Sequence, residues 1–371
     1  MAEMVRGDAR QGAGPARPAM PAVEFRGVSK RYGGVTAVRD LSFAIARATL
    51  VTLLGPSGCG KTSTLRLIAG LEQPNGGRIL IEGADVTHLS AAERDVSMVF
   101  QSYALFPHMS VLENACYGLR ASGMKRGVAE AVAAEKLATV GLAGFERRLP
   151  SELSGGQQQR VAVARAIVLE PKVLLFDEPL SNLDAKLRRR VREDIRALQQ
   201  ELGLTVVYVT HDQEEALAVS DRIIVMQGGA IEQDGTPRDL YESPGSRFIA
   251  DFIGNANLLP VTVQREDGRL ARVSLGGMVL RLPHRDLPSG PACIAVRPQS
   301  IRVQPRSPEA NEIAGHVRKA AYLGSHMEYE LAIDGLPGEV FVIDSDVLAP
   351  LLPGTAVAVA IAPGGAAIVP A

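Results

Sequence analysis

The chain has 371 residues, which is too long for one ordinary domain and long enough for two domains with sizeable cores. Its 40 basic and 41 acidic residues leave a net charge of −1, so composition gives no electrostatic footprint for nucleic acid or an anionic membrane surface. Its three cysteines, Cys59, Cys116 and Cys293, are too few and too scattered for a disulfide framework or a zinc site, and they are consistent with a reducing cytoplasm.

The N-terminal segment 1–21 is rich in Ala, Gly, Pro and Arg without hydrophobic periodicity, which predicts a disordered leader. No apolar run reaches about eighteen residues, and the N-terminus lacks the apolar core of a signal peptide. Any work at a membrane is therefore expected to be done through a partner.

A phosphate-binding loop is indicated by GPSGCGKT at 55–62, which matches the pattern GxxxxGK[ST]. A β-branched and apolar run, 49–54, precedes it and a helically spaced segment, 62–71, follows, as such a loop requires. We expect Lys61 to reach the β- and γ-phosphates of ATP and Thr62 to ligate Mg²⁺. The alternative is a glycine-rich turn with an exposed lysine. The expected ATP-binding loop is Gly55, Pro56, Ser57, Gly58, Cys59, Gly60, Lys61, Thr62 and Ser63.

Two acidic residues end the apolar run 173–176, as at the carboxyl end of a buried parallel strand where ligands bind. Strand alternation places Asp177 and Glu178 on opposite sides. We assign Asp177 to the Mg²⁺ shell and Glu178 to the general base that polarises the attacking water. A turn capped by two acids before Pro179 is the competing interpretation.

The string LSGGQQQR at 153–160 has two compatible interpretations. Ser154 and Gln157 form a capping box ahead of an expected helix over 161–169. A capped helix start with two glycines is also an anion site, and a chain with one phosphate loop has no obvious use for a second. We therefore expect this site to serve the nucleotide of a neighbouring chain.

The phosphate loop, the LSGGQ segment and the two acids after 173–176 are joined by SNLD at 181–184 and by His211. In sequence and in order these motifs resemble the ATPase cassette of ABC transporters, over about residues 22–240. The resemblance implies that two cassettes sandwich two ATP molecules, each between one chain's phosphate loop and the other's signature. It implies that Tyr32 stacks on adenine and that Gln101 senses Mg²⁺ and the membrane partner. It also implies that Ser154 and Gly156, with Gly155 and Gln157 beside them, bind the γ-phosphate of the partner's ATP. Asp184 would cross the dimer, and His211 would be the catalytic switch that contacts the γ-phosphate.

Short apolar runs, 98–100 and 204–210, are expected to deliver Gln101 and His211 to the same sheet edge as Asp177. The segment after Asp184 is expected to be a helix with an apolar stripe and a solvated basic face. The stripe is Leu187, Val191, Ile195, Leu198 and Leu202, and the basic face is Lys186, Arg188, Arg189, Arg190 and Arg192.

A helical insert is expected over about 102–152, with helical spacing at 128–140. In the family this insert docks a short cytoplasmic helix of the membrane subunit. Apolar side chains in its first residues would suit such a groove, although the core of the insert is an equal alternative for each of them. They are Tyr103, Leu105, Phe106 and Met109.

The C-terminal segment, 241–371, changes to short alternating runs separated by Gly, Pro and Asp turns, which predicts a small all-β barrel or sandwich. The runs are ARVSL, MVLRL, CIAVRP, HMEYELAI, EVFVI and AVAVAIA. It resembles the OB-like accessory domain (TOBE) of importer ATPases, chiefly at 296–298 and 322–324. Without a basic groove or a ladder of aromatics, dimerisation or regulation is favoured over nucleic-acid binding.

The expected fold class is thus an α/β P-loop NTPase, an ABC cassette with a helical subdomain, followed by a small all-β OB-like domain. The resemblance implies an ATPase homodimer at the cytoplasmic face of the inner membrane, peripheral to two transmembrane permease subunits and fed by an external solute-binding protein. Polyamine, ferric iron or phosphonate is the expected cargo. The alternatives are a soluble ABC ATPase acting on DNA or the ribosome, and a P-loop kinase.

Overall fold

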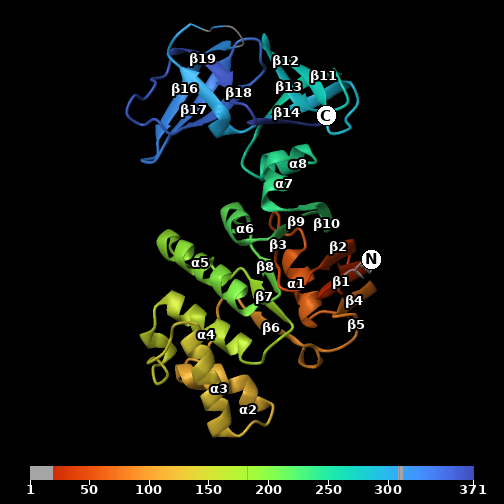
Figure 1. Cartoon of the computed structure of the whole chain (residues 1–371), viewed down its shortest axis with the longest axis vertical. Coiled ribbons are helices and arrows are strands. Elements are labelled where there is room, and N and C mark those ends of the chain that lie inside the picture. Colours follow the sequence, from red (N-terminus) through yellow and green to blue (C-terminus); the bar gives the residue numbers. More distant parts are fainter. Residues whose placement is uncertain (1–19, 182, 308, 310–311) are drawn as a thin grey trace, which may run out of the picture.

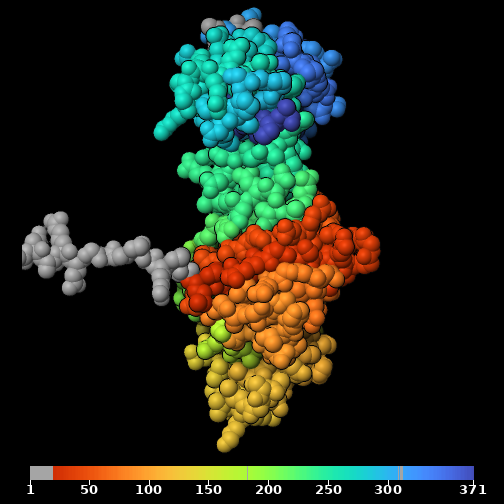
Figure 2. Space-filling model, turned by 90° about the vertical axis from the view of Figure 1, so that its right-hand side faces the viewer, coloured from red at the N-terminus to blue at the C-terminus, as the bar shows by residue number. Residues whose placement is uncertain are grey.

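The computed structural model describes residues 20–181, 183–307, 309 and 312–371. Residues 1–19 of the expected disordered leader lie outside this range, as does Asn182 of the SNLD segment. Figure 1 shows an elongated molecule with a helical insert at one end, an α/β part in the middle and a β-rich part at the other end. Figure 2 shows the β-rich part joined to the α/β part through the green layer that contains α7 and α8.

A sheet of six strands, counted over the described residues, forms the centre of the α/β part. All of its strands run parallel except the edge strand β10. Its inner strands are continuous apolar runs because both faces are covered. Their order is β10 (Ala230–Gly235), β9 (Arg222–Gln227), β3 (Leu50–Leu54), β8 (Val206–Val209), β7 (Val173–Asp177) and β6 (Val96–Val99).

The two faces of this sheet have separate cores. One face packs against α1 (Lys61–Ala69) and an antiparallel sheet. The other face packs against α4 (Gly155–Ile167) and α5 (Ala185–Leu202). The strands of the antiparallel sheet are, in order, β2 (Val35–Ile45), β1 (Val23–Tyr32), β4 (Gly76–Ile81) and β5 (Ala84–Asp85).

The helical insert follows β6 and contains α2 (Val111–Ala121) and α3 (Arg126–Thr139), which pack with α4. The helix expected over 128–140 is therefore confirmed as α3. The expected helix 62–71 ends earlier, at Ala69, because Gly70 adopts a left-handed φ of 74° as its C-cap. The helix expected over 161–169 is α4, which begins six residues earlier, directly after its cap Ser154.

Two five-stranded antiparallel sheets, counted over the described residues, make up the β-rich part and enclose one apolar core. Each of the six alternating runs in the sequence is a strand here, so the all-β prediction is confirmed. One sheet has the order β13 (Met278–Pro283), β12 (Leu270–Leu275), β11 (Asn257–Arg265), β14 (Gly290–Val296) and β20 (Ala366–Pro370). The other has the order β15 (Ile301–Gln304), β19 (Ala356–Ile361), β16 (Ile313–Tyr322), β17 (Met327–Ile333) and β18 (Glu339–Asp344).

Three short helices form the junction between the two parts: α6 (Gln213–Val219), α7 (Pro237–Glu242) and α8 (Arg247–Phe252). Arg297 ties the β-rich part to this junction, because its buried guanidinium donates to the carbonyl oxygens of Tyr241, Ala250 and Ile253. Burial lowers the pKa of this guanidinium. Among the described residues, no helix combines the length and apolar character needed to cross a membrane.

Candidate functional site

The loop between β3 and α1 is shaped by glycines at positions where no side chain fits. A Cβ on Gly55 would lie 2.3 Å from the carbonyl oxygen of Met226, and one on Gly60 would lie 2.3 Å from that of Ala37. Gly58 and Gly60 also have positive φ angles, 77° and 105°. Because Gly60 is the N-cap of α1, no capping side chain competes for the first N–H groups of the helix. These groups are free to bind an anion.

Lys61 lies over this loop. Its side chain is buried, with 5% of the residue exposed. The ammonium Nζ donates to the carbonyl oxygens of Gly55 at 2.7 Å and Pro56 at 2.9 Å, and it lies 3.8 Å from Sγ of the buried Cys59. The alternative of a turn with an exposed lysine is therefore wrong. A positive charge fixed beside the N-terminus of α1 is suited to a triphosphate.

Asp177 is the last residue of β7 and lies at the carboxyl edge of the sheet. Burial raises the pKa of its carboxyl group, and the nearby charge of Arg66 and a hydrogen bond from Thr62 oppose that rise. The Thr62 hydroxyl and the Asp177 carboxylate are thus neighbours, as the sequence analysis expected. Together they offer two hard oxygen donors at one point.

Glu178 follows directly in a strained backbone conformation, with φ at 45°. A non-glycine residue in this region costs about 1–3 kcal/mol and is found where the surroundings hold it in place. Here its N–H donates to the carbonyl oxygen of Val209 at 3.0 Å. The carboxylate Oε2 then lies 3.2 Å from Nδ1 of His211, the residue after β8 and Thr210. The structure therefore brings Glu178 and His211 into contact.

A cavity of about 50 Å³ lies beside this pair. It has room for a water molecule, which needs at least about 10–15 Å³ of such space. A carboxylate that faces a site for one water is the arrangement that general-base activation requires. The lining residues are Glu178, Ser181, Arg188, Thr210, His211, Asp212 and Glu215.

Sequence reasoning missed the polar residues behind this cavity. The Glu215 carboxylate accepts from Thr210 at 2.8 Å and Tyr208 at 3.2 Å, and burial raises its pKa. Arg188 lies 3.4 Å from Asp212 and 3.8 Å from Glu215. The prediction of a solvated basic face is therefore wrong for Arg188. The available signal was helical spacing, which places Arg188 one turn before the buried Val191.

Two further features of α5 bear on the sequence predictions. Leu202, expected in its apolar stripe, is 38% exposed at the last residue of the helix. The stripe therefore ends at Leu198, because Leu202 is the last residue of α5 before its C-cap Gly203. At the other end, Asp184 caps the helix and accepts from the N–H of Leu187 at 2.9 Å.

Gln101 is linked to the same sheet edge through Ser181. Its amide nitrogen donates to Oγ of Ser181 at 3.0 Å, and that hydroxyl donates to the carbonyl oxygen of Glu178 at 3.1 Å. Gln101, Asp177 and His211 lie at the carboxyl ends of three neighbouring strands, β6, β7 and β8. The carboxyl ends of parallel strands share one edge, so the expected convergence of these residues is found.

The signature segment lies elsewhere. Oγ of Ser154 accepts from the N–H of Gln157 at 3.4 Å, and Oε1 of Gln157 accepts from the N–H of Ser154 at 2.9 Å, so the capping box is confirmed. Gly155 and Gly156 form the first turn of α4. Since α4 and α1 pack on opposite faces of the sheet, one chain does not bring its signature to its own phosphate loop (Figure 1).

Tyr32 ends β1 with 42% of its surface exposed, and the ammonium of Lys30 lies 4.9 Å from its ring centroid. An exposed aromatic face with an adjacent positive charge is a platform for a nucleobase and its phosphates.

Comparison with known proteins places these features in a family. A sequence profile described as "ABC transporter" matches residues 38–181, and one described as "TOBE domain" matches residues 294–369. The "Fe(3+) ions import ATP-binding protein FbpC 1" of Rhizobium meliloti (strain 1021) is 58% identical over 94% of this chain and 97% of its own length. This chain belongs to the ABC transporter ATP-binding proteins.

More distant relatives agree with this assignment. The "Fe(3+) ions import ATP-binding protein FbpC" of Escherichia coli (strain K12) is 51% identical over 84% of this chain and 87% of its own length. The solved structure of cbiO1 from Clostridium perfringens, part of the ABC transporter complex cbiONQ, has a TM-score of 0.56 and 26% identity, covering 60% of this chain and 91% of that one. The chain is thus an ATP-binding transporter ATPase with a TOBE domain, and it is a component of a transporter complex by homology.

In the helical insert of this ABC ATPase, the apolar side chains expected to form a docking surface are not all exposed. Tyr103 is only 6% exposed, and Arg165 fixes this turn by donating to the carbonyl oxygens of Tyr103 and Ala104, both at 2.7 Å. Positive φ angles of 59° and 46° at these two residues turn the Tyr103 side chain inward, which spacing alone does not indicate. Of the two interpretations left open for Tyr103, the core of the insert is therefore confirmed and the exposed anchor is wrong, while Leu105, Phe106 and Met109 are half-buried.

A groove of about 460 Å³ lies instead where the insert meets β6 and the end of α4. Its exposed apolar side chains are Phe100 at 39%, Tyr117 at 44% and Leu169 at 46%. Phe106 lines the same groove and packs against Tyr117, with ring centroids 4.6 Å apart. Of the four expected anchors, Phe106 is the one that the structure places in this groove.

Proposed function

We propose that this ABC ATPase powers the import of ferric iron, with residues 22–240 as the ATPase unit and residues 241–371 as a regulatory unit. The observation that carries the ATPase chemistry is the contact of Glu178 with His211 beside a cavity large enough for water. The cargo is inferred from relatives named as Fe(3+) import proteins. Neither of these relatives is named for a polyamine or a phosphonate.

In the proposed reaction, the loop 55–63 and Lys61 hold the triphosphate of ATP, and Tyr32 stacks on its adenine. Oxygen donors from Thr62, Asp177 and Gln101 fit a Mg²⁺ ion, which takes hard oxygen ligands and would neutralise charge on the phosphates. Asp177 must be ionised for this purpose. The Arg66 charge favours the ionised form against the effect of burial.

Glu178 accepts a proton from the water in the adjoining cavity, and that water attacks the γ-phosphorus in line with the leaving ADP oxygen. His211 holds the Glu178 carboxylate through the 3.2 Å contact and, in the family resemblance, also reaches the γ-phosphate. The products are ADP and inorganic phosphate.

The second half of each site is proposed to come from another copy of the chain. Ser154 and Gly156 at the N-terminus of α4 would bind the γ-phosphate of the partner's ATP, with Gly155 and Gln157 in the same turn. Asp184 would cross the dimer. ATP closes this homodimer and hydrolysis reopens it, so the two helical inserts move together and apart.

We propose that, in each copy of the chain, the groove of Phe100, Phe106, Tyr117 and Leu169 receives a short helix from one of the two permease subunits. The ATPase would then lie peripherally at the cytoplasmic face of the inner membrane. A solute-binding protein outside that membrane would deliver cargo to the permease. No contact with nucleic acid is proposed.

The cargo assignment is tested by reconstituting the chain with its permease in vesicles that contain the solute-binding protein. Ferric iron should stimulate ATP hydrolysis, whereas putrescine and 2-aminoethylphosphonate should not. Stimulation by either organic solute without stimulation by iron would refute the cargo. Phosphate release without any acceptor separates an ATPase from a kinase.

A further inference from the structure

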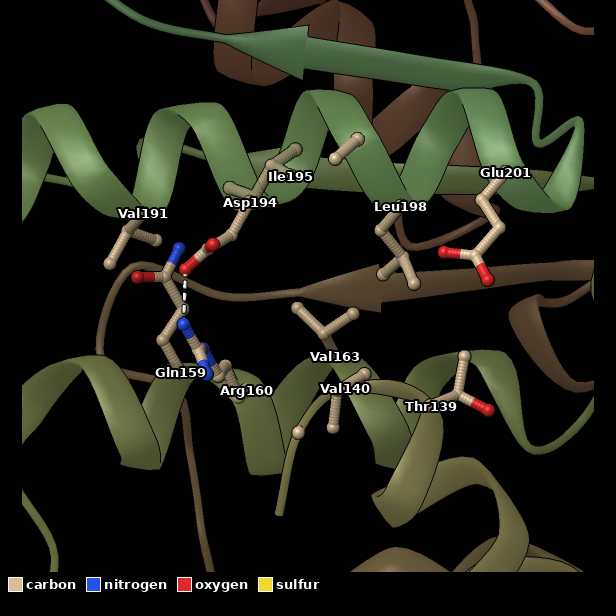
Figure 3. Close-up of a pocket in the computed structure, with 12 residues that line it drawn as sticks. Thr139, Val140, Gln159, Arg160, Val163, Val191, Asp194, Ile195, Leu198 and Glu201 are labelled. Carbon is tan, nitrogen blue, oxygen red and sulfur yellow. Dashed lines mark hydrogen bonds and ion pairs between the residues drawn. The ribbon is translucent and has the colours of Figure 1, made fainter.

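A second groove lies between α4 and α5, outside the nucleotide site, and encloses about 260 Å³. Figure 3 shows side chains of both helices directed toward the space between them. An apolar cavity of about 150 Å³ accepts benzene, so this groove has room for a substituted ring. Its apolar walls are Val140, Val163, Val191, Ile195 and Leu198.

Gln159 of α4 is among the residues that line this groove. The side chain is fully buried, and neither its nitrogen nor its oxygen has a hydrogen-bond partner among the described residues. Figure 3 shows it rising from α4 toward α5, close to Val191 and Asp194. A buried polar group without a partner costs about 1–3 kcal/mol, and this amide presents both a donor and an acceptor. Native proteins retain such groups where a water, ion or ligand completes them.

The charged groups at the groove do not favour an ionic ligand. Arg160 and Asp194 are hydrogen-bonded to each other across the two helices (Figure 3). Glu201 is the other charged residue of the lining, and its carboxylate would repel an anion. A neutral molecule therefore fits this groove better than a carboxylate or a phosphate.

We propose that this α4–α5 groove binds small neutral molecules in which a carboxamide, lactam or imide is attached to an apolar ring. The carbonyl and N–H of such a group complement the donor and acceptor of the Gln159 amide, and the ring packs against the apolar walls. In the proposed dimer both helices begin at a nucleotide site, since α4 follows Ser154 and α5 follows Asp184, so this inference rests on the proposed function. A molecule wedged between them shifts one helix against the other and thereby regulates ATP turnover.

The test uses the full chain with methyl-labelled valine and leucine, titrated with benzamide, benzoate or toluene and followed by NMR. Benzamide should shift the groove methyls and bind at least about tenfold more tightly than benzoate, which lacks the N–H donor and carries a charge. In Gln159→Met, benzamide should bind at least about tenfold more weakly, while toluene binding is kept.

Two leucine-to-tryptophan substitutions on α5, one inside the groove and one outside it, test the same groove without altering Gln159. Leu198→Trp fills the groove and should abolish binding of benzamide and toluene, whereas Leu202→Trp, one turn away and outside the lining, should bind them like the wild type. Saturating benzamide should change the ATPase rate of Leu202→Trp and not that of Leu198→Trp. The proposal is overturned if no probe binds, if benzamide binds Leu198→Trp, or if the ATPase rate of Leu202→Trp does not respond.

Discussion

Replacement of Glu178 by glutamine should separate catalysis from binding in this ATPase. The substitution keeps the length of the side chain and removes its negative charge. General-base catalysis contributes about 10²–10⁴ in rate, or about 3–5 kcal/mol of barrier at 1.36 kcal/mol per decade. Loss of the contact with His211, whose side chain is 59% exposed, should lower stability by less than about 1 kcal/mol. Turnover should therefore fall at least about a hundredfold while thermal unfolding is nearly unchanged.

The assay is phosphate release under saturating ATP, paired with titration of a fluorescent ATP analogue to measure binding. Glu178→Gln should bind the analogue with wild-type affinity, because Lys61 and the phosphate loop are untouched. The control is Glu193→Gln, an exposed acid of α5 that pairs with Arg189 at 3.2 Å and lies outside the site. Its turnover should stay near that of the wild type. Hydrolysis by Glu178→Gln within about tenfold of the wild type would refute the role of Glu178.

Three further changes test the loop, the buried acid and the domain junction. Gly60→Ala places a Cβ 2.3 Å from a backbone oxygen, so it should lower the affinity for ATP at least about tenfold in a fluorescence titration. Gly34→Ala is the control, because a Cβ at Gly34 meets open space, and its affinity for ATP should stay near that of the wild type. Burial raises the pKa of Glu215 in the folded state above its ordinary value of 4.5. The protonated carboxyl group therefore stabilises the fold fully below pH 4.5, and this stability is lost as the pH rises through the raised pKa. Glu215→Gln should flatten that loss in melting curves recorded across pH, and an unchanged slope would contradict it. Arg297→Met leaves three carbonyl acceptors without their donor and should lower the free energy of unfolding by about 2–4 kcal/mol in calorimetry, while the exposed Arg302→Met should have no such effect.

Local sequence patterns were sufficient to predict those parts of the site that are built from a single strand and the turn that follows it. The phosphate loop needs glycines at fixed offsets between a strand and a helix, and those offsets are readable. Asp177, Glu178 and His211 follow apolar runs, and parallel strands of one sheet bring such ends together. Neighbouring strands therefore explain why residues far apart in sequence were correctly predicted to meet.

Features that depend on packing between distant elements were not predictable from spacing. The inward turn of Tyr103 depends on two consecutive positive φ angles and on Arg165 of a later helix. The ion pairing of the half-buried Arg188 depends on acids that follow β8. The alternation of apolar and polar residues identified six strands of the β-rich part. It did not reveal β11, β15, β16 and β20, nor which strands pair with one another. It also gave no sign that Arg297 binds the junction helices.

The central claim is that each ATP is held between the phosphate loop of one chain and the signature of another. Lys61→Ala disables the loop, and Gly156→Asp places a negative charge where the partner's γ-phosphate would bind; either variant alone should be inactive. A mixture of the two forms one dimer site that contains an intact loop and an intact signature. Phosphate release should therefore reappear when the two inactive variants are mixed. If every mixing ratio stays as inactive as the separate variants while mixed dimers are present, both halves of the site belong to one chain and the account is wrong.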